Sequence, residues 1–200
     1  MTTRIIFLLP YLACLALSLG VLAYTWKRRH VKGAANYAAY ILSHNLWTGG
    51  FILELLNPSL DAKVFWDGLQ WIFGSAVVLS FLLFTINYTG QEVRKPRRFW
   101  TLLATIPAIF IILLITNPYH HLVYADPYLQ PEQGYPALLY TFTPVMLFYG
   151  AYCLSIAAVA VVPILRGLQS PHQLYRYQIL TILLGFLLPF VGSALTLAGI

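Results

Sequence analysis

Six long apolar runs, separated by shorter polar connections, constrain this chain more than any other feature of its sequence. The runs cover about residues 5–24, 34–56, 64–88, 99–115, 137–165 and 177–197. At about 1.5 Å per residue, each run is long enough, or nearly so, to cross a hydrocarbon core of about 30 Å. The sequence therefore predicts an all-α integral membrane protein, a polytopic helical bundle with six transmembrane helices in this chain.

Composition supports this fold class and argues against an enzyme. Sixty per cent of the residues are hydrophobic and 9% are charged, whereas soluble domains carry about 25% charged residues. The connections leave no room for a separate catalytic domain, and no Gly-rich phosphate loop or activated nucleophile is present. We therefore expect no catalytic residues and no cofactor. Cys14 and Cys153 each fall inside an apolar run, where small packing residues are expected rather than a disulfide.

The basic residues predict the orientation of the helices. Ten of the twelve follow the first, third and fifth runs, and only Arg4 and Lys63 lie on the other side. The positive-inside rule then places the N-terminus outside the cell. The same bias accounts for the formal charge of +6 without a nucleic-acid partner. Six spans leave the last residue outside as well, and residues 195–200 end without a polar stop, so we expect a seventh helix beyond Ile200.

The longest connection follows the fourth run and covers the 19 residues 117–135. It begins with Asn117-Pro118, a pair typical of turns, and continues with His120 and His121. Long connections in compact folds often carry function. We therefore expect this segment to contribute to a site on the outer side.

Four stretches of the sequence, in this order and spacing, resemble the seven-helix membrane sensor region at the N-terminus of many prokaryotic sensor histidine kinases. They are Trp47 with Glu54, LFTINYTG at 83–90, TNPYHHLVY at 116–124, and YRYQ at 175–178 followed by Gly185 and Pro189. The resemblance extends over nearly the whole chain, from the first apolar run to the sixth.

This resemblance implies a sensory function. Residues 1–200 would form a multi-pass sensor domain in a prokaryotic plasma or inner membrane, with six of seven helices in this chain. It would detect an extracellular or membrane-borne signal and relay it by helix rearrangement to a cytoplasmic histidine kinase or diguanylate cyclase domain in the same polypeptide. The resemblance also implies a homodimer. The alternative is a small-solute transporter, which would need repeated halves, and no convincing internal repeat relates the first three runs to the last three.

Glu54 is the strongest candidate for a signal site, because an ionisable residue within a membrane span is costly and often functional. It shares one helix face with Trp47, and Gln70 and Trp71 occupy the same outer end of the next run. We expect these four residues to form the walls of a site for an unknown small ligand, since such pockets combine apolar surfaces with a few polar groups.

The connection at 117–135 is expected to cover this site. Asn117, His120, His121 and Tyr124 would form a lid, with one histidine turned inward. The alternative is that these residues only seal the end of the bundle. Adjacent histidines diverge in direction and do not chelate well by themselves, so we expect no metal site unless folding brings acidic ligands to them.

Three further expectations concern polar and aromatic residues within the runs. Lys63 and Asp67, four residues apart, are expected to form an ion pair at the membrane interface. His44 is expected to make a hydrogen bond between helices. Tyr140, Tyr149 and Tyr152 could line a cavity open to the outside if Pro144 kinks the fifth helix.

Overall fold

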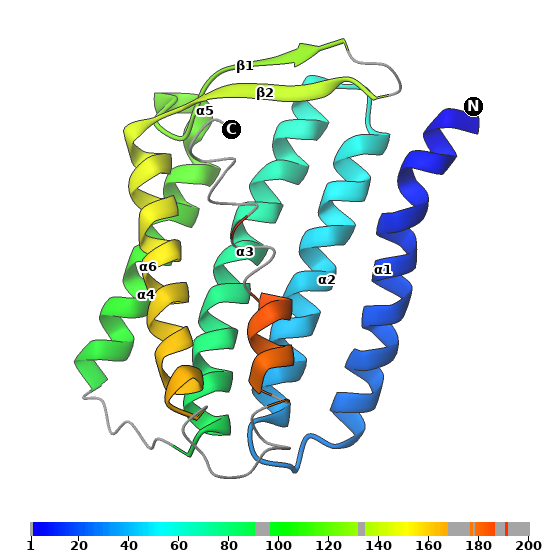
Figure 1. The fold of residues 1–200 in the computed structure, drawn as a ribbon. Helices are drawn as coiled ribbons and strands as arrows, with labels where there is room; N and C mark the ends of the chain where they lie inside the picture. The colour runs from blue at the N-terminus through cyan, green and yellow to red at the C-terminus, as the bar shows by residue number, and fades with distance from the viewer. Residues whose placement is uncertain are drawn as a thin grey trace.

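The structure, a computed structural model, describes residues 2–90, 97–131, 135–167, 177, 179–186 and 191. Its elements are helices α1 (Thr2–Lys27), α2 (Ala34–Leu56), α3 (Leu60–Tyr88) and α4 (Arg97–Ile115), the short helix α5 (Asn117–His120), strands β1 (Tyr124–Gln130) and β2 (Ala137–Phe142), and helix α6 (Pro144–Gly167). Residues 177, 179–186 and 191 are also helical. The long helices lie side by side, and the β1–β2 hairpin crosses one end of the bundle (Figure 1).

Local sequence signals account for the boundaries of the central helices. Helix α2 ends before Asn57-Pro58, because proline has no N–H to continue the helical ladder. Helix α3 then begins after Ser59, whose hydroxyl accepts a hydrogen bond from the Ala62 N–H at 3.3 Å as an N-cap residue does. The turn between α1 and α2 contains Gly33 at φ +83°, a left-handed conformation that glycine adopts without strain.

Helix α3 is the centre of the bundle and packs against α2, α4, α6 and both strands, whereas α1 packs mainly against α2. Two apolar cores pack against α3. We name them by the orientation predicted from the sequence: the outer core lies at the hairpin end of the bundle and the inner core toward the opposite end. The inner core contains buried residues of α2, α3, α6 and the helical segment 179–186, including a stacked pair of rings, Phe81 and Phe186, with centroids 3.4 Å apart. The outer core contains Phe110 of α4, Val123 just before β1, Tyr124 of β1, and Met146 and Tyr149 of α6. Val64 and Trp71 of α3 pack against this outer core, whereas none of the described residues of α2 belongs to it.

Four of the described helices are long and apolar enough to cross a membrane: Phe7–Lys27, Leu60–Tyr88, Arg98–Ile115 and Pro144–Arg166. Helix α2 has 23 residues, but its asparagines, histidine, serine and threonine reduce its mean hydropathy. The expected count of six spans is therefore supported for four helices. Much of the sixth predicted span, including Pro189, lies outside the described residues.

The prediction for residues 137–165 is wrong in its first part. Residues 137–142 form strand β2, paired antiparallel with β1, so the chain is not all-α. Pro144 does not kink a helix but occupies the first position of α6, where its missing N–H costs nothing. Thr143 caps this helix by accepting a hydrogen bond from the Met146 N–H at 3.2 Å. Tyr140 therefore belongs to the hairpin rather than to a membrane helix.

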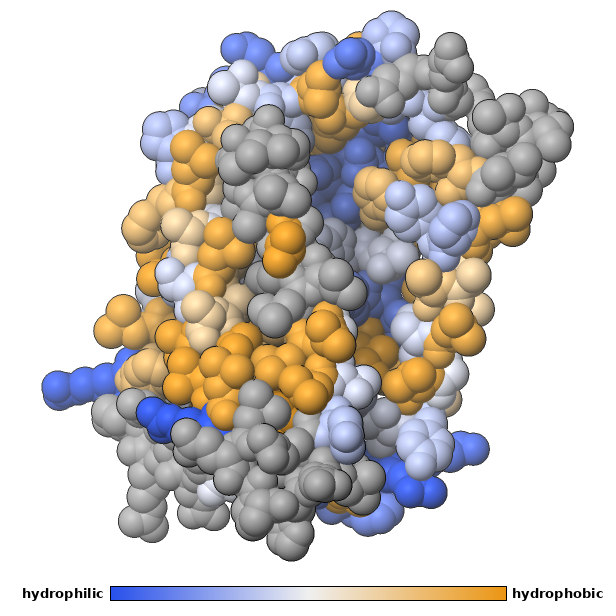
Figure 2. Space-filling model, in the orientation of Figure 1, coloured by the Kyte–Doolittle hydropathy of each residue, from blue (hydrophilic) through white to orange (hydrophobic). Residues whose placement is uncertain are grey.

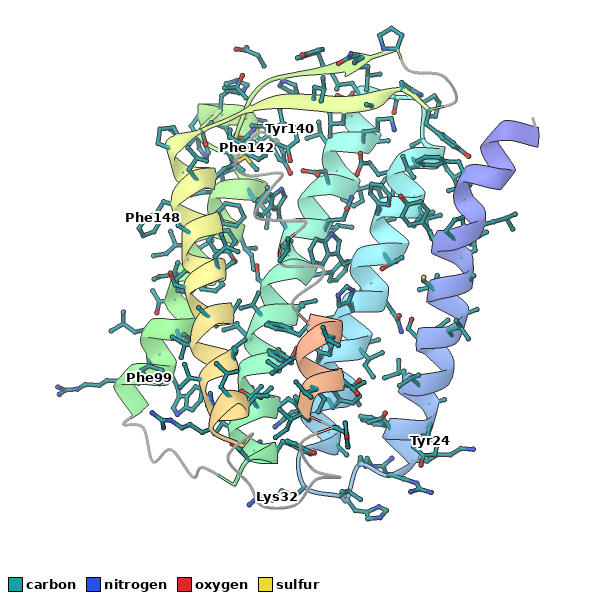
Figure 3. The ribbon with its side chains drawn as sticks, viewed as in Figure 1. Tyr24, Lys32, Phe99, Tyr140, Phe142 and Phe148 are labelled. Carbon is teal, nitrogen blue, oxygen red and sulfur yellow. The ribbon has the colours of Figure 1, made fainter. Side chains whose placement is uncertain are left out.

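Within the 117–135 connection, Asn117–His120 form α5 and Tyr124–Gln130 form β1, the first strand of the hairpin. The register of the hairpin shifts between Ala125 and Tyr128, where Asp126 adopts φ 49° in a β-bulge. The hairpin and the beginning of α1 lie at the same end of the bundle, and Tyr24 and Lys32 lie at the opposite end (Figure 3). Two aromatic rings, Phe7 and Tyr135, join α1 to the chain before β2, with centroids 5.9 Å apart.

This arrangement permits a direct test of the predicted orientation. In a variant with Cys14 and Cys153 replaced by alanine, a cysteine at Tyr128, which is exposed on β1, should react with a membrane-impermeant maleimide in intact cells. A cysteine at the exposed His30 should react only after the membrane is permeabilised, because basic connections remain inside. The reverse labelling pattern would invert the topology.

Candidate functional site

Polar side chains meet where the outer ends of α2 and α3 lie under the hairpin. We call this group the outer polar cluster. It consists of Glu54 from α2, Lys63, Asp67, Gln70 and Trp71 from α3, Tyr124 from β1 and Tyr140 from β2. Figure 2 shows hydrophilic side chains recessed in a hollow below the hairpin, between apolar surfaces.

Glu54 joins α2 to α3 through two different atoms. Its carboxylate oxygen Oε2 accepts a hydrogen bond from Gln70 Nε2 at 2.7 Å, and its backbone carbonyl accepts one from Lys63 Nζ at 2.7 Å. All three residues are buried, and Lys63 has no exposed surface. The Lys63 ammonium thus covers the carboxyl end of α2, where the helix dipole favours a positive charge. It also lies close enough to the Glu54 carboxylate for the two charges to attract.

A glycine makes this contact between helices possible. Gly50 lies one turn before Glu54, and a Cβ atom at Gly50 would stand 3.1 Å from Gln70 Cγ. The missing side chain lets Gln70 lie against α2 and reach the carboxylate. Close helix approach at small residues is typical of membrane bundles.

Asp67 joins α3 to both strands of the hairpin. Its Oδ2 atom accepts hydrogen bonds from the hydroxyl of Tyr124 at 2.6 Å and from that of Tyr140 at 3.1 Å. The two tyrosine rings meet edge to face with centroids 4.9 Å apart. Trp71 Nε1 points at the Tyr140 oxygen at the long distance of 3.5 Å. Figure 3 shows Tyr140 directed from β2 into the bundle.

Burial, with a further contribution from the Asp67 charge, raises the pKa of both Tyr124 and Tyr140 well above the ordinary value for tyrosine. Both phenols therefore remain protonated at any physiological pH and act as donors to the carboxylate. The expected ion pair of Lys63 with Asp67 is wrong: Lys63 donates to the Glu54 carbonyl, and Asp67 accepts from the two tyrosines.

Asn117 fixes the start of the hairpin. Its buried side chain accepts hydrogen bonds from the N–H groups of Val123 at 2.8 Å and Tyr124 at 3.1 Å, and it donates to the Tyr124 carbonyl at 3.4 Å. One amide thus satisfies three backbone groups across six or seven residues. This geometry places the Tyr124 side chain above Asp67.

The two histidines occupy different positions, and neither contacts the outer polar cluster through a hydrogen bond that the described residues show. His120 is half-buried; its Nδ1 accepts from the Leu122 N–H at 3.0 Å, so the hydrogen on Nε2 is directed to Thr116 Oγ1, also at 3.0 Å. His121 is exposed, with φ 53°, at the end of α5. Within the described part of the chain, no three or more His, Cys, Asp or Glu side chains are grouped to hold a metal ion.

The four predicted wall residues divide between two regions. Glu54, Gln70 and Trp71 meet at the outer polar cluster, whereas Trp47 packs against the inner core and stacks on His44 with ring centroids 5.7 Å apart. Their role in ligand binding stays a prediction. The sequence predicted that Tyr140 lines a cavity from a helix with Tyr149 and Tyr152, whereas it lies on β2 and donates to Asp67. The sequence also gave Lys63 a different partner. Both contacts depend on tertiary packing.

The role of Asn117 gives a prediction for stability. Asn117→Ala leaves the buried N–H groups of Val123 and Tyr124 without their acceptor, and each such group costs about 1–3 kcal/mol. We expect a lower midpoint of thermal unfolding in detergent and faster amide exchange in β1. The matched variant Asn57→Ala removes a half-buried side chain whose hydrogen bond in the described structure goes to the Leu53 carbonyl of its own helix, and it should change both quantities much less. Equal losses in the two variants would contradict this role.

Comparison with known proteins gives one match. The model of the family described as the N-terminal 7TM region of histidine kinase matches residues 10–200. No curated protein and no solved structure matches the chain.

Proposed function

The chain belongs to the family of N-terminal 7TM regions of histidine kinases, and we propose that it detects a signal in the outer half of the bundle and relays it by helix rearrangement to a cytoplasmic output domain. This domain would be a histidine kinase, or a diguanylate cyclase, in the same polypeptide. The protein would act as a homodimer in a prokaryotic plasma or inner membrane. The outer polar cluster is the observation that carries this proposal.

The contrast between the two halves of the bundle supports a movable outer end. In the inner half, α2, α3, α6 and residues 179–186 share a continuous apolar core. In the outer half, α2 is held to α3 by directional bonds of Glu54 with Gln70 and Lys63. Directional bonds can be exchanged for bonds to a ligand, whereas close apolar packing changes less readily.

Helix α3 provides the path to the inner side. It carries Asp67 at its outer end, beneath the hairpin, and Phe81 at the inner core. A signal that replaces the bonds of Glu54 or Asp67 would alter how α3 sits against α2 and the hairpin. Small shifts of packed helices are an established form of switching.

The chemistry of the cluster indicates which ligands would fit. Glu54 and Asp67 supply acceptors, Gln70 supplies both a donor and an acceptor, and Trp71 supplies an apolar ring. We propose a small polar ligand with hydrogen-bond donors or a positive charge, contacted by Glu54, Gln70 and Trp71. Tyr124 would close the site from above, held in place by Asn117.

Kinase output tests this proposal. In the complete kinase that carries this chain, Glu54→Gln should change basal autophosphorylation in membrane vesicles by about tenfold, because hydrogen bonds to charged groups contribute about 1.5–3 kcal/mol to the balance between two states. The control Leu53→Ile alters an exposed neighbour on the same helix. If Glu54→Gln lowers only the amount of folded protein and leaves specific activity unchanged, the cluster is structural.

A further inference from the structure

A groove lies on the outer part of the bundle between α3 and α4, below α5 and the start of β1. It encloses about 570 Å³. Its walls are apolar and include Gly68 and Ile72 of α3 and Leu114 of α4. Its polar lining includes Asp61 at the beginning of α3 and His121 at the end of α5. The groove therefore combines a long apolar wall with an acid and an imidazole near the outer end of the bundle.

The residues around the groove indicate that it opens into lipid. Both α3 and α4 are long and apolar enough to cross a membrane. The side chains of Phe65 and Ile115, which line the groove, are 59% and 69% exposed, and exposed apolar side chains on spanning helices face acyl chains. The acyl chains of neighbouring lipids are therefore the molecules with the most direct access to the groove.

The polar groups further restrict the occupant. The carboxylate of Asp61 attracts an ammonium group, and the exposed imidazole of His121 can donate a hydrogen bond to a phosphate oxygen. An anionic headgroup without an amine would meet the carboxylate with repulsion only. We propose that the groove binds a phospholipid of the outer leaflet, with one acyl chain between α3 and α4 and a zwitterionic, amine-bearing headgroup at Asp61 and His121.

The groove adjoins the outer polar cluster. Tyr124 lines it and also donates to Asp67 at 2.6 Å. A bound lipid thus touches a residue that joins the hairpin to α3, and it would favour one arrangement of the two. This link to signalling rests on the proposed function, whereas lipid binding does not.

Photocrosslinking tests the binding. The chain is reconstituted in vesicles that contain phosphatidylethanolamine with a diazirine on its acyl chain, and crosslinked peptides are quantified by mass spectrometry. Gly68→Phe should fill the groove and reduce crosslinking to α3 and α4 by about tenfold, because excluding two methylene groups at about 0.8 kcal/mol each suffices. Crosslinking to α1, whose Leu17 is 74% exposed, should remain unchanged and serves as an internal reference.

Three further variants complete the experiment: a second filled groove, a control at an unrelated position, and a test of the headgroup preference. Ile72→Trp fills the same groove from another position and replaces Gly68→Phe if that variant does not fold. Leu17→Phe adds an aromatic ring at an unrelated lipid-facing position and should not reduce crosslinking at the groove. Asp61→Asn should abolish the preference for labelled phosphatidylethanolamine over labelled phosphatidylglycerol.

Unchanged crosslinking to α3 and α4 in both filled variants would overturn the proposal. Equal labelling by the two lipids in the unmodified chain would overturn its headgroup part. Because no kinase output enters this measurement, its failure would leave the sensory function intact. Conversely, a kinase that ignores the outer polar cluster would leave the crosslinking result intact.

Discussion

Replacing Tyr124 and Tyr140 together by phenylalanine is expected to release the hairpin from α3. The double variant keeps both rings but removes the two hydroxyl groups that donate to Asp67 at 2.6 and 3.1 Å. A hydrogen bond to a charged group contributes about 1.5–3 kcal/mol, and because both bonds end on one carboxylate, the free energy of unfolding should fall by more than one such bond but by less than the sum of two. Asp67 is half-buried, and water that reaches its carboxylate can replace part of the lost hydrogen bonds, so the decrease in the free energy of unfolding should lie near the lower end of this range.

Amide hydrogen exchange measures this release directly. In the double variant, β1 and β2 should exchange much faster, while the inner core of α3 around Phe81 keeps its protection. Each single variant should show a smaller effect, and the two should not be additive, because both bonds end on one carboxylate. Tyr128→Phe, a change at an exposed tyrosine of β1, is the matched control. A hairpin that stays protected in the double variant would show that Asp67 does not hold it.

The apolar runs predicted the helix positions well where a run ends at a polar turn. Helix α2 covers Ala34–Leu56, the same residues as the predicted run, because Gly33 and Asn57-Pro58 interrupt the apolar sequence at both ends. Helix α3 begins four residues earlier than its run, at Leu60. Its first turn contains the charged residues Asp61 and Lys63, and a prediction based only on apolar runs places such residues in a connection between helices.

The hairpin was missed because β2 and α6 are apolar and contiguous. Residues 137–142 are rich in leucine, threonine and aromatic residues, and a short apolar run does not distinguish a strand from a buried helix. The signal that separates them is Thr143-Pro144, a capping residue followed by proline at the first helical position. Read as a helix start, this pair would have left residues 137–142 for a strand.

The outer polar cluster was predictable in part. Glu54, Gln70 and Trp71 were placed at one end of adjacent helices by their positions in the runs, and the structure brings Glu54 and Gln70 to 2.7 Å. The tyrosine pair at Asp67 depends on the register of the hairpin, and the position of Lys63 depends on how α2 and α3 turn around Asn57. Neither follows from local sequence.

Replacing Lys63 by methionine is expected to destabilise the outer half of the bundle strongly. Methionine keeps an unbranched side chain of similar length but removes the ammonium group, which is fully buried and donates to the Glu54 carbonyl at 2.7 Å. The carbonyl loses a donor at the end of α2, and the buried Glu54 carboxylate loses its nearby positive charge. A hydrogen bond from a charged donor contributes about 1.5–3 kcal/mol, and the lost attraction to the Glu54 carboxylate adds to this cost, which should appear as a clear decrease in the thermal unfolding midpoint in detergent.

A double-mutant cycle separates the loss of charge from the loss of packing. Adding Glu54→Gln to Lys63→Met removes the uncompensated carboxylate, so the double variant should recover part of the stability lost by Lys63→Met alone. Lys32→Met, at an exposed position in the turn between α1 and α2, should change the midpoint little. If the losses of Lys63→Met and Glu54→Gln simply add, the two charges are not coupled, and Lys63 stabilises the fold only through its hydrogen bond to the end of α2.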